Sequence, residues 1–119
     1  MAPSLLRLAG FLGVGLLLAG STGCQKKQPG DTQAEGKRLF DSICARCHGS
    51  DGRGGVPSAE GQPAPTNFND AAFHASRSDA QLTQVIKQGK GPMPPFGNLF
   101  DEAQTASLVA HVRSFNPKK

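Results

Sequence analysis

The chain has 119 residues, which is enough for one domain at most. Its net charge of +4 at pH 7 is mildly basic and too sparse to indicate binding to nucleic acid. A domain of this size that is rich in glycine and proline, and has no Trp or Tyr, has a marginal apolar core, so we expect a bound group or a cross-link to stabilise it.

The first 20 residues resemble a secretory signal. Arg7 is followed by an apolar run, Leu8 to Gly20, that contains no acidic residue. A permanent membrane helix is the alternative, but the run is shorter than the roughly 20 residues that span a bilayer, and it contains four glycines. The pattern therefore predicts export from the cytoplasm.

The segment "STGC", which ends in Cys24, resembles the cleavage site of a bacterial lipoprotein, with Ser21 where such sites usually have Leu. Cleavage there removes residues 1–23 as a signal peptide and leaves Cys24 to be acylated; a free or disulfide-bonded Cys24 is the alternative. An exported chain with three cysteines would otherwise have one unpaired thiol in an oxidising compartment, and acylation of Cys24 accounts for it. We expect residues 24–31 to be a lipidated tether that holds residues 32–119 at the periplasmic or another extracytoplasmic face of a membrane.

The domain is expected to be all-α, with three main helices. The first begins near Thr32, where Thr32 and Glu35 form a capping box, and continues to the second and third cysteines of the chain. The second follows the cap residue Ser78 and stops at Gly89, and the third covers residues 101–115. No segment shows the sustained alternation of apolar and polar residues that predicts strands.

The first two helices are separated by residues 49–69, a stretch with five glycines and three prolines. A structureless loop of this length is unusual in so small a domain. The loop makes sense if it wraps a bulky ligand.

The most specific motif is "CARCH", at the end of the first helix. Cys44 and Cys47 lie on one side of a helical turn, and His48 follows directly. Two sulfurs so placed can form thioethers with the two vinyl groups of a haem while the histidine coordinates the iron, which is the attachment signature of c-type haem. One covalent haem c would also supply the cross-link that the small core lacks.

Three other kinds of site use similar residues. A thioredoxin-like dithiol belongs in a βαβ setting, which this sequence does not predict. A zinc site would need a further ligand from His74 or His111, at spacings unlike those of structural zinc sites. A disulfide between Cys44 and Cys47 would close a loop too small to remove much entropy from the unfolded chain.

The second face of a haem iron is either open or bound by another side chain. Met1 leaves with the signal, so Met93 is the one methionine available, and it lies in the proline-stiffened segment "GKGPMPPFG". Met93 as a filler of the core is the alternative. His74 and His111 compete for the iron, but we expect His111 to pack against the first helix and His74 to lie on the surface. Ligation by His48 and Met93 predicts a comparatively high reduction potential.

From residue 32 to residue 116 the chain resembles a class I cytochrome c. "EGKRLFDSICARCHG", the Gly/Pro-rich loop, "GKGPMPPFG" and "ASLVAHVRSF" occur in that family's order. The resemblance implies the small class I cytochrome c fold, with Gly36 and Phe40 packed against the last helix, where His111 replaces the family's usual aromatic residue.

The resemblance also implies how the histidine of the motif is oriented. A carbonyl of the long loop, that of Pro65 in preference to Pro63, accepts a hydrogen bond from Nδ1 of His48 and raises the basicity of the ring.

Together these features predict a membrane-tethered electron carrier that passes single electrons between respiratory or other periplasmic redox partners, such as an oxidase, a reductase or a dehydrogenase. Contacts with such partners are small and weak. Iron with six ligands leaves no position for a substrate, so we expect no enzymatic activity of the protein itself, acting as a monomer or as a complex subunit. The alternatives are a fixed haem subunit of a larger oxidase or reductase complex, and a ligand-binding haem sensor.

Overall fold

The computed structural model describes residues 29–55 and 57–118, so the predicted signal peptide and Cys24 lie outside the described residues. Beyond an isolated bridge between Lys90 and Met93, these residues form no β-structure, and the predicted all-α fold is confirmed. None of their helices has the length and apolarity needed to cross a membrane. The helical elements are α1 (Pro29–Leu39), the π-helical turn η1 (Phe40–Cys44), α2 (Ala45–His48), α3 (Ala71–Ser76), α4 (Asp79–Gln88) and α5 (Glu102–Ser114).

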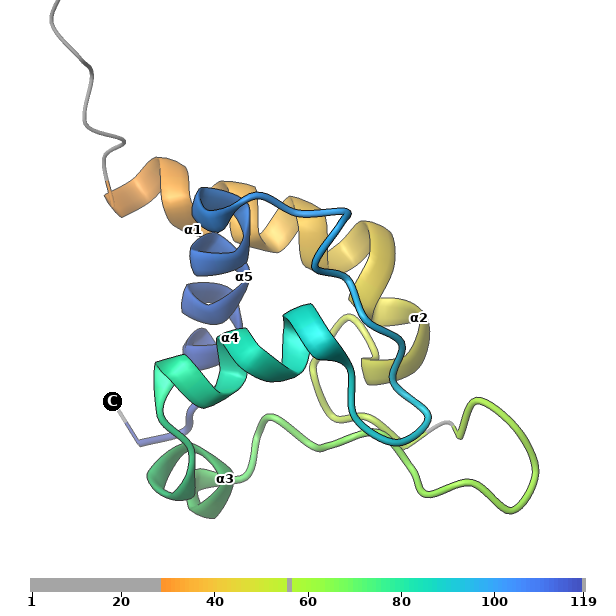
Figure 1. Cartoon of the computed structure of the whole chain (residues 1–119). Helices are drawn as coiled ribbons and strands as arrows, with labels where there is room; N and C mark the ends of the chain where they lie inside the picture. The colour runs from red at the N-terminus through yellow and green to blue at the C-terminus, as the bar shows by residue number, and fades with distance from the viewer. Residues whose placement is uncertain (1–28, 56, 119) are drawn as a thin grey trace, which may run out of the picture.

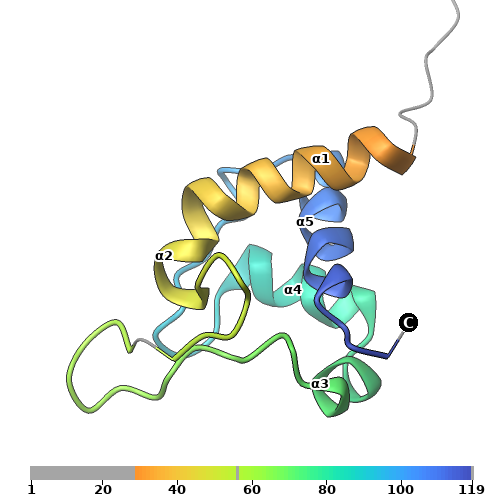
Figure 2. The same cartoon turned by 180° about the vertical axis from the view of Figure 1, so that it is seen from behind.

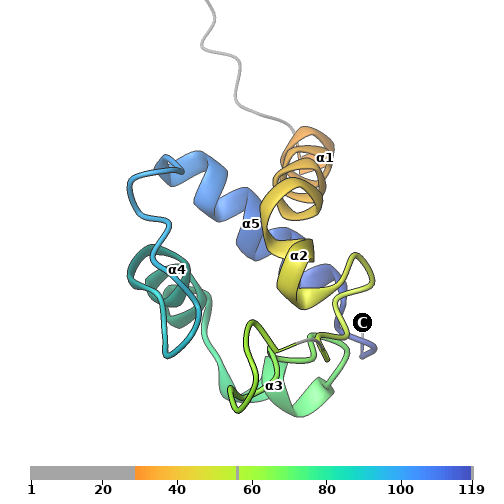
Figure 3. The same cartoon turned by 90° about the vertical axis from the view of Figure 1, so that its right-hand side faces the viewer.

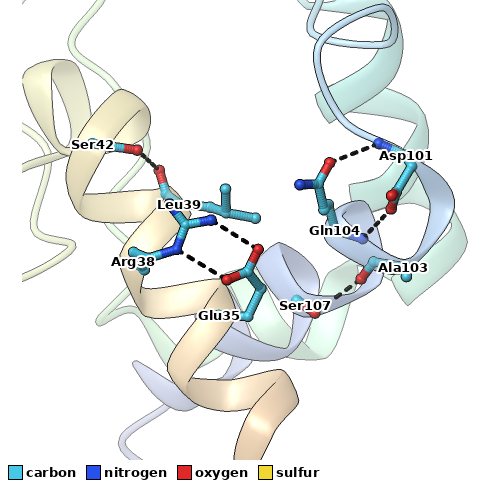
Figure 4. A network of polar contacts seen from close by, with 8 residues as sticks. All are labelled: Glu35, Arg38, Leu39, Ser42, Asp101, Ala103, Gln104 and Ser107. Carbon is cyan, nitrogen blue, oxygen red and sulfur yellow. Dashed lines mark hydrogen bonds and ion pairs between the residues drawn. The ribbon is translucent and has the colours of Figure 1, made fainter. Parts of the chain in front are cut away.

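The first three elements form one helical path that leads to the cysteine motif (Figure 1, orange to yellow). The path begins at Pro29, earlier than predicted, and proline suits the first helical position because its missing N–H has no partner there in any case. Thr32 therefore lies inside α1, and the predicted cap at this residue is wrong. Glu35 forms an ion pair with Arg38, one turn further on, with Nη2 and Oε1 2.9 Å apart (Figure 4).

The end of this path carries the motif and then turns away sharply. The π-helical turn η1 was not predicted; it places an extra residue in one turn just before α2, and such turns are frequent at functional sites. Gly49 ends α2 with φ at 74°, a conformation that favours glycine, and its N–H donates to the carbonyl of Ala45 over 2.9 Å. The chain leaves the helix directly after His48.

The other two predicted helices, α4 and α5, both begin with capping residues, and the cap Ser78 of α4 was predicted. Ser78 and Gln81 form a reciprocal pair at the start of α4, in which each side chain accepts the backbone N–H of the other residue. Asp101 and Gln104 form the same arrangement at the start of α5 (Figure 4). Gly89 follows the last residue of α4, as predicted.

The core is centred on the crossing of α1 and α5, which lie against each other in Figures 1 and 2. Gly36 makes the close approach possible, because a Cβ atom on it would lie 2.0 Å from the carbonyl oxygen of Ser107. Phe40 is 1% exposed, and its ring centroid lies 5.0 Å from that of His111 and 5.4 Å from that of Phe115. The predicted packing of Gly36, Phe40 and His111 between the first and last helices is confirmed.

The rest of the fold leaves α2 and α4 apart from each other (Figure 3). The short helix α3 was not predicted as such; it is capped by Asp70, whose side chain accepts the N–H of Ala72 over 2.9 Å. The long loop is closed on itself where the N–H of Phe68 donates to the carbonyl of Gly52 over 2.7 Å. The buried apolar residues that join these parts into one core are Leu39, Phe40, Phe68, Leu82, Phe100, Leu108, Val109 and Val112.

Candidate functional site

The two cysteines of the motif lie at the edge of a cavity. Cys44 is half-buried and Cys47 is exposed, and both are free thiols. Burial, and to a lesser degree the neighbouring Cys47, raises the pKa of Cys44 to about 11. Cys44 is therefore protonated near neutral pH, which disfavours the reactive thiolate of a dithiol oxidoreductase.

The cavity has a volume of ≈ 380 Å³ and is lined by the cysteine motif and by the segment around Met93. A second cavity of ≈ 510 Å³ shares His48, Thr66, Val85, Lys90 and Met93 with the first. Because the two cavities share these five residues, they form one cleft, hereafter the His48–Met93 cleft. Each half has the size of a small-molecule or cofactor site.

His48 is held in the cleft from two directions. Its ring stacks on the ring of Phe68, with the centroids 4.5 Å apart and an interplanar angle of 19°. Its Nδ1 lies 3.2 Å from the carbonyl oxygen of Thr66. Since a carbonyl only accepts, Nδ1 carries the hydrogen and Nε2 keeps a lone pair for a metal ion.

The protonation of His48 favours the same role. Burial lowers the pKa of His48, although the hydrogen bond to Thr66 partly opposes this effect. The imidazole is therefore neutral at pH 7, and a neutral imidazole is the form that binds metal ions.

The hydrogen bond to His48 was predicted one residue too early in the loop. The carbonyl of Thr66, not that of Pro65, accepts it. The carbonyl of Pro65 packs instead against Gly54, where a Cβ atom would lie 2.3 Å from the oxygen. Both Thr66 and Pro65 line the cleft, so the segment was correctly placed and the residue was wrong.

Met93 lies in a tight turn whose backbone is bonded to itself and to α4. Lys90 and Met93 exchange two backbone hydrogen bonds, of 3.0 and 3.1 Å. Gly89 has a φ of 74°, and a Cβ atom on it would lie 2.5 Å from the carbonyl oxygen of Met93. After the turn, the N–H of Phe96 donates to the carbonyl of Ile86 over 2.9 Å. These bonds fix Met93, half-buried, in the wall of the cleft.

The two other histidines are buried away from the cleft and line neither half of it. His111 lies in the crossing of α1 and α5, where burial lowers its pKa and its Nε2 has no hydrogen-bond partner. His74 is 8% exposed, so the prediction of a surface position is wrong. Among residues 29–55 and 57–118, no three His, Cys, Asp or Glu side chains gather as a metal-binding group, which disfavours the zinc site.

The sequence reasoning missed Thr66 and Phe68. An aromatic residue shortly after the "PAP" segment was visible, but its stacking on His48 depends on how the long loop folds back. Residues that contact each other across 18 or 20 positions of irregular chain leave no periodic signal.

Most of the chain is similar to known cytochromes. The family model described as cytochrome c oxidase, cbb3-type, subunit III matches residues 31–112. Cytochrome c6 of Chlorolobion braunii is 34% identical over 80 residues, which are 66% of this chain and 85% of that protein. The cbb3-type cytochrome c oxidase subunit FixP of Azorhizobium caulinodans is 33% identical over 93 residues, but the chain spans only 29% of its length.

A solved structure is similar as well. The KustC0563 c-type cytochrome superposes with a TM-score of 0.55 at 30% sequence identity, and the match covers 68% of this chain and 96% of that one. The likeness therefore extends over nearly the whole of that protein and over about two thirds of this chain.

Proposed function

The chain belongs to the cytochrome c family, and on this premise we propose that it is a one-electron carrier whose His48–Met93 cleft holds one haem c. Family membership implies covalently bound haem c and electron transfer. The observation that carries the assignment is that free thiols, a neutral imidazole and a thioether, from segments up to 49 positions apart, line one cleft. The similarity to the solved c-type cytochrome bears out the predicted small class I cytochrome c fold.

The side chains present fit this group. Cys44 and Cys47 would hold it through thioethers, and His48 and Met93 would bind the iron. The bound iron supplies a centre that takes up and releases one electron. Tetrahedral zinc would instead require further ligands beside Cys44 and Cys47, and no group of three His, Cys, Asp or Glu side chains is found among the described residues.

The chain contributes orientation and exclusion of water. Thr66 and Phe68 fix the ring of His48, and the backbone bonds between Lys90 and Met93 fix the turn that carries Met93. A His/Met pair held in this way favours the reduced state of the iron relative to two histidines. The apolar side chains that line the cleft and keep it dry include Ile43, Val85 and Phe96.

A redox titration of the purified protein, followed by visible spectroscopy, tests this assignment. Replacement Met93→Ala is expected to abolish the weak far-red sulfur-to-iron band of the ferric form and to lower the midpoint potential, because the thioether stabilises the reduced state. Leu99→Ala is the matched control, since Leu99 follows the same loop but is 57% exposed. An unchanged band in Met93→Ala would mean that Met93 is not the ligand.

Carbon monoxide separates the carrier from a ligand-binding sensor. If Met93 stays bound to the reduced iron, added carbon monoxide leaves the spectrum of the reduced protein unchanged over the time of an electron-transfer assay. A rapid spectral change would favour the sensor.

A second candidate function is a fixed subunit of a respiratory oxidase or reductase complex. It is favoured by the family model, which is that of an oxidase subunit, and by the similarity to FixP. Co-purification with a larger complex after mild detergent treatment would support this function. A freely exchanging monomer would support the mobile carrier.

We propose further that the chain is exported and anchored through Cys24, with residues 1–23 removed and residues 24–31 as the tether. The support is the sequence pattern, since these positions lie outside the described residues apart from the start of α1. Cys24→Ser is expected to release the protein from the membrane fraction to the soluble extracytoplasmic fraction. Retention of the variant in washed membranes would contradict lipidation.

A further inference from the structure

A hydrogen-bonded histidine lies behind the cleft, on the short helix α3. Nε2 of His74 lies 2.7 Å from the carbonyl oxygen of Phe68. Because a carbonyl only accepts, Nε2 carries the hydrogen, and in the neutral ring Nδ1 is the acceptor. Nη1 of Arg113 lies 3.3 Å from that Nδ1 and donates to it. Both ring nitrogens of His74 are therefore engaged, and the ring has one defined tautomer.

Arg113 connects this histidine to α5 and to the start of α4. Its Nη1 also donates to the carbonyl of His74 over 3.1 Å, and its Nε donates to a carboxylate oxygen of Asp79 over 2.8 Å. A further bond joins its Nη2 to the carbonyl of Arg77. The planar guanidinium thus fixes the position of α3 relative to two longer helices.

The backbone of Phe68 is held on both sides. Its carbonyl accepts from His74, and its N–H donates to the carbonyl of Gly52 over 2.7 Å. Two positions earlier in the same segment, the carbonyl of Thr66 accepts from Nδ1 of His48, while the ring of Phe68 covers one face of His48. The segment Thr66–Phe68 therefore links His74 to His48 by direct contacts.

We propose that His74 is a positioning residue for His48. Together with Arg113 it fixes the segment Thr66–Phe68, and this segment sets the orientation of the His48 ring by one hydrogen bond and one stacked contact. The inference rests on the proposed function, in which His48 binds the haem iron. His74 touches neither the cleft nor the iron and acts only through the loop.

The test compares His74→Leu with His74→Gln in the haem-loaded protein. Leucine removes the donor to Phe68, whereas the amide of glutamine can restore it. Local opening of the segment should increase about fivefold in His74→Leu, the factor expected for loss of one net hydrogen bond. Hydrogen exchange measured by NMR on the reduced protein should therefore accelerate at the Phe68 amide and at Nδ1–H of His48, and remain at the wild-type rate in α5.

The reduction potential gives a second readout. A looser hydrogen bond from His48 to Thr66 makes the imidazole a weaker donor to the ferric iron, so the midpoint potential of His74→Leu should shift upward. His74→Gln should return both the exchange rates and the potential toward wild type. Arg113→Met should change the exchange rates and the potential in the same direction as His74→Leu, but less. Its control is Arg38→Met, which removes an exposed ion pair on α1.

The outcomes separate the two proposals. Faster exchange throughout the protein at an unshifted potential would show that His74 is merely structural, and would overturn the inference. If His74→Leu does not fold, the hydrogen-exchange rates and the midpoint potential of Arg113→Met distinguish a positioning role from a merely structural one in the same way. If the wild-type spectrum shows that His48 does not bind iron, the proposed function fails by itself, while the exchange rate of the Phe68 amide still reports whether His74 fixes the loop.

Discussion

The crossing of α1 and α5 gives the sharpest test of the packing, through the substitution Gly36→Ala. In an exposed helix this change stabilises, because alanine is favoured over glycine by about 1 kcal/mol. Here the added Cβ would lie 2.0 Å from the carbonyl oxygen of Ser107, 2.7 Å from its carbonyl carbon and 3.0 Å from Cβ of His111. The first two atoms belong to the backbone of α5, so a rotamer change cannot relieve the contact.

The expected magnitude follows from these two opposing effects. Inserting a methyl group into a packed core costs typically about 1–3 kcal/mol, and a clash with backbone belongs at the upper end of that range. After the gain in helix propensity is subtracted, the free energy of unfolding should fall by about 2 kcal/mol. For a domain of this size, 1 kcal/mol corresponds to about 4–8 °C, so Tm should fall by roughly 8–16 °C.

The measurement is thermal unfolding of the ferric protein, followed by far-ultraviolet circular dichroism. Ala34→Gly is the matched control, because Ala34 lies exposed on the same helix and should show the ordinary preference for alanine, with a loss of about 1 kcal/mol. If Gly36→Ala were as stable as the wild type or more stable, α1 and α5 would not approach each other as closely as the structure indicates.

The remaining predictions concern one buried polar atom and one turn. His111→Phe should raise the free energy of unfolding by about 1–3 kcal/mol, because it removes the unpartnered Nε2. Burial lowers the pKa of His111, with Asp41 opposing, so the unfolded state binds more protons and the wild type loses stability as the pH falls below 6.5. Urea titrations above and below pH 6.5 should show that His111→Phe loses less free energy of unfolding on acidification than the wild type does. Equal losses in the two proteins would contradict the reasoning. Gly89→Ala should weaken the far-red ferric band, since the added Cβ meets the carbonyl of Met93, and an unaltered band would show that the turn absorbs the change.

Much of the fold could be predicted because its signals are local. Ser78 with Gln81 marks the start of α4 through side chains three positions apart, and Gly89 marks its end. The start of α1 was missed for a related reason: Thr32 and Glu35 match a capping pattern, but Pro29 also suits a first helical position, and the earlier start prevails. Local patterns identify an element more reliably than its first residue.

The parts that could not be predicted depend on contacts between distant segments. Nothing in the neighbourhood of His74 shows that it is buried, because its burial comes from Phe68 and from Arg113, which is 39 positions away. The prediction of Pro65 instead of Thr66 as the hydrogen-bond acceptor for His48 was wrong for a similar reason. A motif places the loop beside His48, but which carbonyl faces the ring depends on the turn that Gly54 makes possible.

The two proposed iron ligands are held by different segments of backbone. His48 is held by the segment Thr66–Phe68, which is fixed to α5 through His74 and Arg113. Met93 is held by a turn whose hydrogen bonds lead back to α4, as when the N–H of Gly97 donates to the carbonyl of Lys87 over 3.1 Å. Arg113 also binds Asp79 at the start of α4, so the two supports meet at this arginine. Perturbations add only where sites share no partner, so we expect coupling between the orientation of the imidazole and the position of the thioether.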